Sequence, residues 1–329
     1  MVKDIKIKTS GIAAGKFMLS KLEYKAFNNK SGSFMSCELS DTSGSIKAVM
    51  WDNTEPIKAW AKNKIVVDIV GEVSIYKDIP QVQIKTITPA KSYSPADFIP
   101  ALPQKTIGDL IKRLISNIPT EPTHKKKWKL LLDGAYIEKF STCPGGVGDV
   151  HHAYLGGLIE HTCFMVEIAK YMADTQFPNL DKNVLMTGCL LHDIGKMTCY
   201  EWDTVIQMSD EGRLLHHTHT GYILFMNMID QLGMERSDLT ILKLAHIIVS
   251  HHEDEGIKKT LLPEATAVAL IDNLNASTNF SLGYVGKEES KEPDSNWTKY
   301  CQLTGRQYFI PKKPDILAPS ILDDILHGH

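Results

Sequence analysis

The most constraining feature of this sequence is the stretch CLLHDIGKMTCY, residues 189–200. It places His192 and Asp193 directly after the apolar pair Leu190 and Leu191. Ionisable side chains at the end of an apolar run lose their hydration unless a charged partner offsets that loss. A bound metal ion is such a partner, so this stretch predicts a buried helix that ends at a metal site.

Four other places supply imidazole or carboxylate groups at helical spacing behind apolar residues. His161 shares a stripe with Leu158 and Met165, and Asp272 follows Val268 at the same period. The remaining groups are His217 in LLHHTHTGY and the pair His251 and His252 in VSHHED.

A single inward histidine is more often a hydrogen-bonded core residue than a metal ligand. His246 is interpreted in that structural way, and His124 and His151 as surface groups or groups behind the ligands. Five inward sites in a domain rich in Leu, Ile and Met are hard to satisfy by mutual hydrogen bonds, so the set predicts metal binding.

The first ninety residues alternate with the two-residue period of β-strands. Turn signals lie at 28–32, 41–44 and 78–80, and NTEPIKAWAKN reads as a short helix between the third and fourth strands. Five strands with a helix in that position predict an OB-fold barrel.

The rest of the chain is helical in period, with breaks at STCPGGVGD and WDTVIQMSDEGRLLH. We therefore expect a multidomain protein, in which a five-stranded barrel precedes an all-α domain. The expected limits are 1–90 for the barrel, 91–104 for a linker, 105–285 for the helical domain and 286–329 for a C-terminal extension.

The ordered set H…HD…H…HH…D resembles the HD-domain metal-dependent phosphohydrolases, which are all-helical. More narrowly, HHAYLGGLIEHT, LLHDIGK, DEGRLLHHTHTG, VSHHED and ALIDNLNA, behind an OB-like barrel, are similar to the YhaM-type 3′-to-5′ exoribonucleases. The bare HD pair is a weak signal, whereas the ordered set is a strong one. The resemblance spans roughly residues 10 to 310.

The resemblance implies that one metal ion is held by His161, His192, Asp193 and Asp272. Asp193 would bridge to a second ion held by His217, His251 and His252, and Lys196 would steady a phosphate. His216 and His219 flank His217, so the register of the ligand there stays open. An imidazole and carboxylate set favours Mn²⁺, with Fe²⁺, Mg²⁺ and Zn²⁺ as alternatives.

OB-like barrels bind single strands by stacking bases on exposed aromatic rings along a basic groove. Residues 1–90 hold 13 Lys against 9 Asp and Glu, whereas the whole chain has a net charge of −3. We expect single-stranded RNA or DNA to contact Tyr24, Phe27, Lys30 and Tyr76. Trp51 and Phe34 are interpreted as packed inside the barrel.

The function expected is metal-dependent 3′-to-5′ hydrolysis of single-stranded RNA, with DNA as a possible substrate. The alternatives are an HD phosphohydrolase of nucleotides or cyclic nucleotides, and a non-catalytic single-strand-binding module. No run of about 18 apolar residues suits a membrane span, and the six cysteines show no C-x-x-C spacing, so we expect a cytoplasmic protein with reduced thiols. The oligomeric state stays open.

Overall fold

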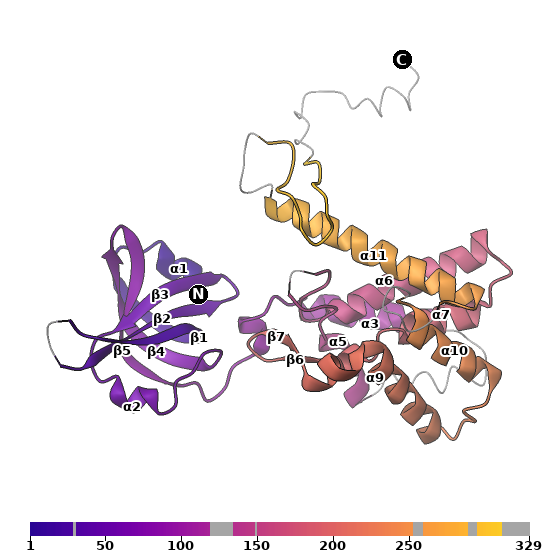
Figure 1. Cartoon of the computed structure of the whole chain (residues 1–329), viewed down its shortest axis with the longest axis horizontal. Coiled ribbons are helices and arrows are strands. Elements are labelled where there is room, and N and C mark those ends of the chain that lie inside the picture. The colour runs from indigo at the N-terminus through magenta and orange to yellow at the C-terminus, as the bar shows by residue number, and fades with distance from the viewer. Residues whose placement is uncertain (29–30, 119–133, 149, 253–258, 289–294, 311–329) are drawn as a thin grey trace, which may run out of the picture. The chain divides into compact units, whose positions relative to one another are not determined.

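The computed structural model describes residues 1–28, 31–118, 134–148, 150–252, 259–288 and 295–310 (Figure 1). The predicted Lys30 and His124 and the end of the C-terminal extension lie outside these residues. The chain divides into two compact units, Met1–Asn273 and Leu274–His329, and the predicted catalytic residues all belong to the first.

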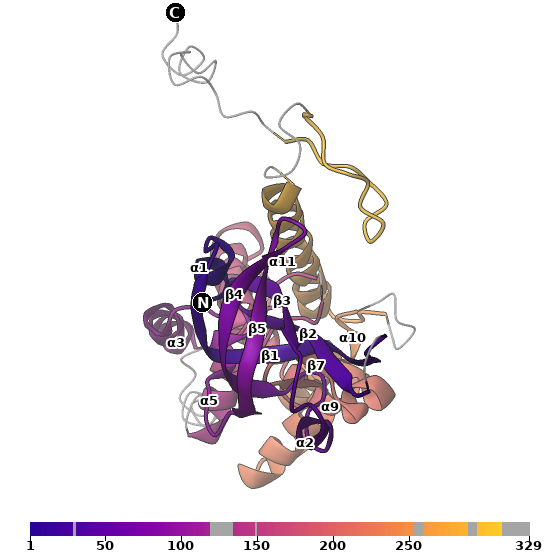
Figure 2. The same cartoon turned by 90° about the vertical axis from the view of Figure 1, so that its left-hand side faces the viewer.

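The N-terminal part is a closed five-stranded barrel with the strand order β1-β2-β3-β5-β4 (Figure 2). All neighbouring strands are antiparallel except β3 and β5, which run parallel. The strands are β1 Gly11–Ala26, β2 Ser33–Asp41, β3 Gly44–Met50, β4 Val66–Tyr76 and β5 Ile79–Pro89, with helix α2 Glu55–Lys58 between β3 and β4. The predicted OB-fold is confirmed.

The two-residue period explains how the barrel closes around its core. In β2, Met35, Cys37 and Leu39 are buried while the residues between them face outward. Gly71 stands where the β4–β5 register shifts, and a Cβ there would lie 2.5 Å from the Gln83 carbonyl oxygen. Only glycine allows the two strands to approach that closely.

A short helix that the sequence did not predict, α1 Val2–Lys6, packs against the barrel. Val2 and Ile5 are buried in the barrel core, and the Val2 backbone N–H donates to Asp41 Oδ2 at 2.8 Å. Apolar burial and this hydrogen bond hold a helix that is too short to be stable alone.

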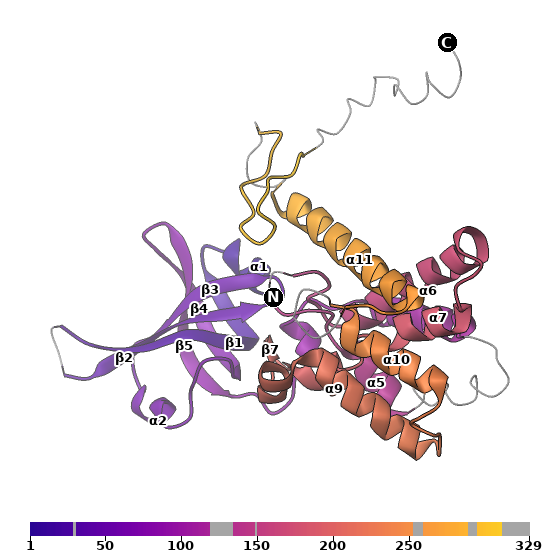
Figure 3. The ribbon, with the colours of Figure 1, turned by 45° about the vertical axis from the view of Figure 1, so that its right-hand side comes forward.

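Helices dominate the chain after the linker, as predicted (Figure 3). Helix α6 packs against α3 and α7, and α10 packs against α7 and α9. The helices are α3 Gln104–Asn117, α5 Ala135–Thr142, α6 Gly157–Tyr171, α7 Lys182–Leu191, α8 Lys196–Cys199, α9 Asp210–Gln231, α10 Leu239–Ser250 and α11 Pro263–Glu288; the short helical turns Pro95–Asp97 and Met172–Gln176 complete them.

The segment WDTVIQMSDEGRLLH, predicted as a break, contains regular structure. A two-stranded hairpin of β6 Tyr200–Trp202 and β7 Ile206–Met208 precedes α9, whose N-cap Ser209 accepts a hydrogen bond from the Gly212 backbone N–H. Strands of three residues are too short for their period to be read from sequence.

A single apolar core binds the helices together. Most of its fully buried members come from α3, α6, α7, α9, α10 and α11. The largest are Leu114, Leu158, Ile159, Met165, Leu185, Leu191, Phe225 and Ile229. The predicted metal ligands lie at the ends or inner faces of these same helices, so the core fixes their positions.

Candidate functional site

The predicted acid and imidazole groups meet at one buried place in the helical part. His161 lies in the middle of α6, His192 caps the C-terminus of α7, and His251 caps the C-terminus of α10. The other members are Asp193, His217, His252 and Asp272. Helix ends and inner faces from five elements therefore converge on one point.

The first half of the cluster consists of His161, His192 and Asp193, whose ligand atoms all lie within 4.8 Å of one another. The Nε2 atoms of His161 and His192 are 3.2 Å apart, and His192 Nε2 lies 3.1 Å from Asp193 Oδ2. Asp272 Oδ1 lies 3.2 Å from His161 Nε2, beside this trio.

The second half brings together Asp193, His217, His251 and His252, again within 4.8 Å. Asp193 Oδ1 lies 3.3 Å from His217 Nε2 and 3.7 Å from His251 Nε2. The two oxygens of Asp193 thus face different sets of histidines. A carboxylate placed in this way could bind one ion through each oxygen.

Backbone carbonyls orient the imidazole rings. His192 Nδ1 donates to the Cys189 carbonyl at 2.8 Å, and His251 Nδ1 donates to the Ile248 carbonyl at 3.0 Å. A neutral ring that donates through Nδ1 presents the lone pair of Nε2, and here Nε2 points into the cluster. Such backbone partners are typical behind metal-binding histidines.

The ionisation of the cluster suits a cation. Burial opposes the charged form of Asp193, but Lys196 and His192 outweigh it and hold its pKa well below the usual range. The pKa of Asp272 is also lowered against the effect of burial, chiefly by its hydrogen bond with His161. Burial lowers the pKa of His217, and burial together with His251 lowers that of His252 to about 4.

Among the described residues, two buried carboxylates, those of Asp193 and Asp272, therefore share the cluster with one buried ammonium group, that of Lys196. Neither oxygen of Asp193 has a hydrogen bond of acceptable geometry within the described parts of the chain. Lys196 offsets only one of the two carboxylate charges; the remaining buried negative charge is costly, and one or two divalent cations would offset it. The residues present thus fit the metal ions that the sequence predicts.

Lys196 is buried and its ammonium group is fully engaged. Its Nζ lies 2.7 Å from Asp193 Oδ2 and donates to the Gly145 carbonyl at 2.8 Å. Burial opposes its charged form, but the Asp193 carboxylate outweighs this effect and raises the pKa. The structure places Lys196 where it orients Asp193.

The close packing around Gly195 explains why the motif HDIGK needs a glycine at this position. A Cβ on this residue would lie 1.9 Å from the His217 carbonyl oxygen and 2.5 Å from the Gly221 backbone nitrogen. Helix α9 can approach the turn after α7 only because no side chain stands there. This close approach brings His217 to Asp193.

The register of the HHTHTG segment is visible in the structure. Helix α9 has a kink at His216, where φ is 62° and ψ is 154°, and His217 follows it inside the cluster. His219 is exposed on the opposite face. His216 is half-buried, with its ring centroid 4.1 Å from that of His217.

A group of polar residues lies beside His161, of which sequence reasoning named His151 and missed His152, Tyr154 and Glu160. The ring centroids of His151 and His152 lie 5.9 and 5.5 Å from that of His161. His152 Nδ1 lies 2.9 Å from Tyr154 Oη and 3.2 Å from Glu160 Oε2. Burial, with Lys196 and His161, lowers the pKa of His151 to about 4. The doubled histidine ten residues before His161 was the available signal.

His246 has the structural role expected for it. Its Nε2 accepts a hydrogen bond from the Leu261 backbone N–H at 2.9 Å, away from the cluster.

On the barrel, three aromatic rings gather where β1 ends, β2 begins and β3 ends. The ring centroids of Phe34 and Trp51 are 4.9 Å apart, and Phe27 lies 5.5 Å from Phe34 and 6.3 Å from Trp51. We call Phe27, Phe34 and Trp51 the aromatic platform. Trp51 is 41% exposed, so its predicted place inside the barrel is wrong, and Phe34 is half-buried rather than fully packed inside.

The other predicted nucleic-acid contacts lie apart from the platform. Tyr76 is 59% exposed at the β4–β5 turn, with Lys77 Nζ 5.6 Å from its ring centroid. Tyr24 is half-buried beneath Lys58, whose Nζ lies 5.2 Å from the ring centroid.

None of the helices that the structure describes has the length and apolarity needed to cross a membrane.

Comparison with known proteins agrees with these observations. Residues 158–277 match the HD domain family. The chain is 27% identical over 319 residues to the 3′-5′ exoribonuclease YhaM of Bacillus subtilis, covering 94% of this chain and 99% of that protein. The YhaM protein of Bacillus velezensis is 27% identical over 284 residues, covering 84% and 88%.

Among solved structures, a replication protein A heterotrimer bound to single-stranded DNA is 12% identical over 25% of this chain and 60% of that one. Its TM-score of 0.21 is too low to support any argument. The near full-length match to the Bacillus proteins, together with a closed barrel followed by an HD domain, instead shows that this chain is similar to the YhaM-type exoribonucleases.

Proposed function

We propose that this chain is a metal-dependent 3′-to-5′ exoribonuclease that captures single-stranded RNA on its barrel and hydrolyses the terminal phosphodiester in its HD domain. The observation that carries the proposal is Asp193, whose two oxygens face two separate sets of histidines. The match to proteins named as 3′-5′ exoribonucleases supports both the reaction and its direction.

The ligands proposed for the first ion are His161, His192, Asp193 and Asp272, and those for the second are Asp193, His217, His251 and His252. Mn²⁺ is the favoured metal, with Fe²⁺, Mg²⁺ and Zn²⁺ as alternatives, because the donors mix imidazole with carboxylate. When bound, the ions would supply positive charge at the phosphate and an activated water. Asp193 and Asp272 provide the negative charge, and the rings provide neutral nitrogen donors.

The predicted phosphate contact of Lys196 is modified by its position. Its ammonium group is buried between Asp193 and the Gly145 carbonyl, so its proposed role is to hold the bridging carboxylate in place. Lys196 would therefore act on the substrate only indirectly, by positioning Asp193.

The proposed capture surface is the aromatic platform, with Tyr76 and Lys77 at the β4–β5 turn. OB-folds bind strands on the β2–β3 face and on the loops after β1 and β4, where these residues lie. Stacking on exposed rings tolerates any base, which suits an enzyme that shortens many sequences. The nucleic-acid contacts of Tyr24, Phe27, Lys30 and Tyr76 stay predictions. The domain limits and the cytoplasmic location also stay predictions.

One experiment separates the candidate functions. The purified chain with Mn²⁺ is incubated with 5′-labelled single-stranded RNA, with the same sequence as DNA, and with mononucleotides and cyclic dinucleotides. We expect a ladder of progressively shorter 5′-labelled RNA and no turnover of the small compounds. Turnover of the small compounds alone would indicate a nucleotide phosphohydrolase, and binding without any turnover would indicate a binding module.

A further inference from the structure

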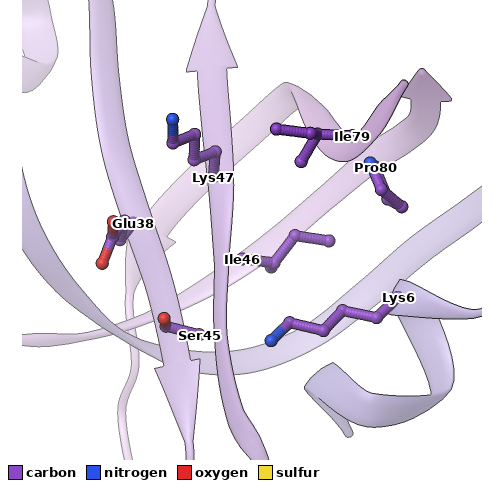
Figure 4. A pocket seen from close by; sticks show the side chains of 7 residues that line it. All are labelled: Lys6, Glu38, Ser45, Ile46, Lys47, Ile79 and Pro80. Atoms are coloured by element: carbon purple, nitrogen blue, oxygen red, sulfur yellow. The ribbon is translucent and has the colours of Figure 1, made fainter. Parts of the chain in front are cut away.

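The barrel carries a groove of about 350 Å³ between α1 and strands β2, β3 and β5 (Figure 4). Its apolar lining comes from Ile79 and Pro80 and from Ile46, which is largely buried in the barrel core, and its polar lining includes Lys6, Ser45 and Lys47. The Lys6 side chain reaches from α1 toward Ser45. The groove lies outside both the HD site and the aromatic platform.

The groove is positively charged. Lys6 and Lys47 are exposed, and neither has an ion-pair partner in the described chain. A Cβ on Gly44 would lie 3.4 Å from Lys6 Nζ, which places this ammonium group over the β2–β3 turn.

The acidic groups nearby are already engaged. Glu38, which also lines the groove, pairs with Lys21 at 2.9 Å. Asp41 accepts hydrogen bonds from the backbone N–H groups of Val2 and Ser43 at 2.8 and 2.7 Å. The charges of Lys6 and Lys47 thus remain available to an anion.

The groove is also preformed. Val2 and Ile5 bury α1 in the barrel core, and the Lys3 backbone N–H donates to Ser43 Oγ at 3.0 Å. Because α1 is docked by apolar contacts, the Lys6 backbone is held in place before any ligand arrives.

Strands β2 and β3 carry both the groove and the platform on the same outer face. Lys47 and Trp51 are four residues apart, as are Glu38 and Phe34, while Ile46, Ala48 and Met50 between them point inward. Residues of equal parity share a face, so Lys47 lies roughly 13 Å along the strand from Trp51. A strand that stacks on the platform and follows β3 reaches Lys47.

We propose that Lys6 and Lys47 bind backbone phosphates of the single strand whose bases stack on the aromatic platform. This inference rests on the proposed function and adds α1 to the nucleic-acid surface. Lysine suits this role because its ammonium group is a compact charge that makes no demand on base sequence. The groove extends the capture site beyond the rings.

The test is strand binding by fluorescence anisotropy, in the full chain carrying Asp193→Asn so that the RNA stays intact. The probe is single-stranded RNA of about 12 nucleotides, which lies within the site sizes of OB-folds. Lys6→Gln with Lys47→Gln is compared with Lys62→Gln and Lys85→Gln, which remove the same charge elsewhere on the barrel. Thermal melting checks that each variant is folded.

We expect the groove variant to raise Kd about tenfold at low salt and to reduce the slope of log Kd against log salt by about 1.4, or about 0.7 for each phosphate that a lysine no longer neutralises. The control pair should keep the slope, and a nucleoside monophosphate should not compete. Equal slopes in both pairs, or competition by the mononucleotide, would overturn the groove assignment. Failure of the Asp193→Asn parent to bind RNA would instead count against the proposed function.

Discussion

At the scale of single residues, Asp193 is the side chain on which the site depends. It is buried, its oxygens face two histidine sets, and Lys196 holds one of those oxygens at 2.7 Å. We expect Asp193→Asn to lower kcat with Mn²⁺ by at least about a hundredfold while Kd for single-stranded RNA stays unchanged, because an amide is a poor bridge between cations. Asp109→Asn, an exposed carboxylate on α3, is the matched control. Substantial remaining activity with normal metal content would contradict the bridging role.

The three histidines of HHTHTG make a second residue-scale prediction. His217 is buried, and its Nε2 lies 3.3 Å from Asp193 Oδ1. His219 is exposed, and two residues along a helix correspond to a rotation of about 200° around α9. We expect His217→Ala to lose one equivalent of metal by elemental analysis, and His219→Ala to lose none. His216→Ala should also keep both equivalents, because the kink turns its backbone out of the helical path. Loss of metal from the His219 variant would show that the ligand is His219 rather than His217.

The buried His217 and the half-buried His151 and His252 also predict how stability depends on pH. In the folded chain the pKa values of His151 and His252 are lowered to about 4, and the pKa of His217 is lowered as well. Histidines in an unfolded chain have a pKa of about 6.5. The unfolded state therefore binds more protons between these values, so stability is lost as the pH falls through this window. Urea midpoints of the metal-free chain should fall from about pH 7 to about pH 4. His151→Asn should flatten this dependence, and His219→Gln should leave it unchanged.

At the scale of elements, the packing of the α7–α8 turn against α9 depends on Gly195. Added atoms there meet the backbone of His217 and Gly221, which cannot move without shifting α9. We expect Gly195→Ala to lower the free energy of unfolding by about 2 kcal/mol or more and to weaken metal binding. Gly108→Ala in α3 is the control, since a Cβ there meets nothing within 4 Å and should stabilise the helix by up to about 1 kcal/mol. If Gly195→Ala and Gly108→Ala changed the free energy of unfolding equally, the close approach of α9 at Gly195 would not contribute to stability.

The elements that sequence could predict are those with many repeats of their period. Strands of seven or more residues, such as β2 and β4, and the helices that bear His161 and Asp272 were predictable, because each shows its alternation or stripe several times. Helix α1 and the β6–β7 hairpin were not, since five and three residues show no period. The kink at His216 depends on tertiary packing and leaves no local signal.

Trp51 was misplaced for a different reason. Its residue type favours burial, but its position continues the outward parity of Lys47 and Val49 beyond β3. Strand parity, which was available in the sequence, is the better guide here, because a one-residue step turns every side chain to the other face. The aromatic platform could thus have been found from the pattern alone.

At the scale of the whole molecule, capture and hydrolysis are assigned to different parts of the chain. The platform rings belong to the barrel, and the ligand cluster belongs to the HD domain. A long strand offers many bases for stacking, whereas a dinucleotide offers at most two and has a single phosphodiester for the metal site. Changes to the platform should therefore affect the two substrates differently.

We expect Trp51→Ala with Phe34→Ala to raise the apparent KM for long single-stranded RNA by about 5- to 150-fold for each base that loses its stacking partner, because stacking contributes roughly 1–3 kcal/mol per base. The change in kcat/KM for a dinucleotide should be far smaller. Phe177→Ala and Tyr171→Ala, which remove exposed rings from the helical part, form the matched control. If the platform variant slowed both substrates equally, the rings would support the fold rather than hold the strand, and the barrel would lose its assigned role in capture.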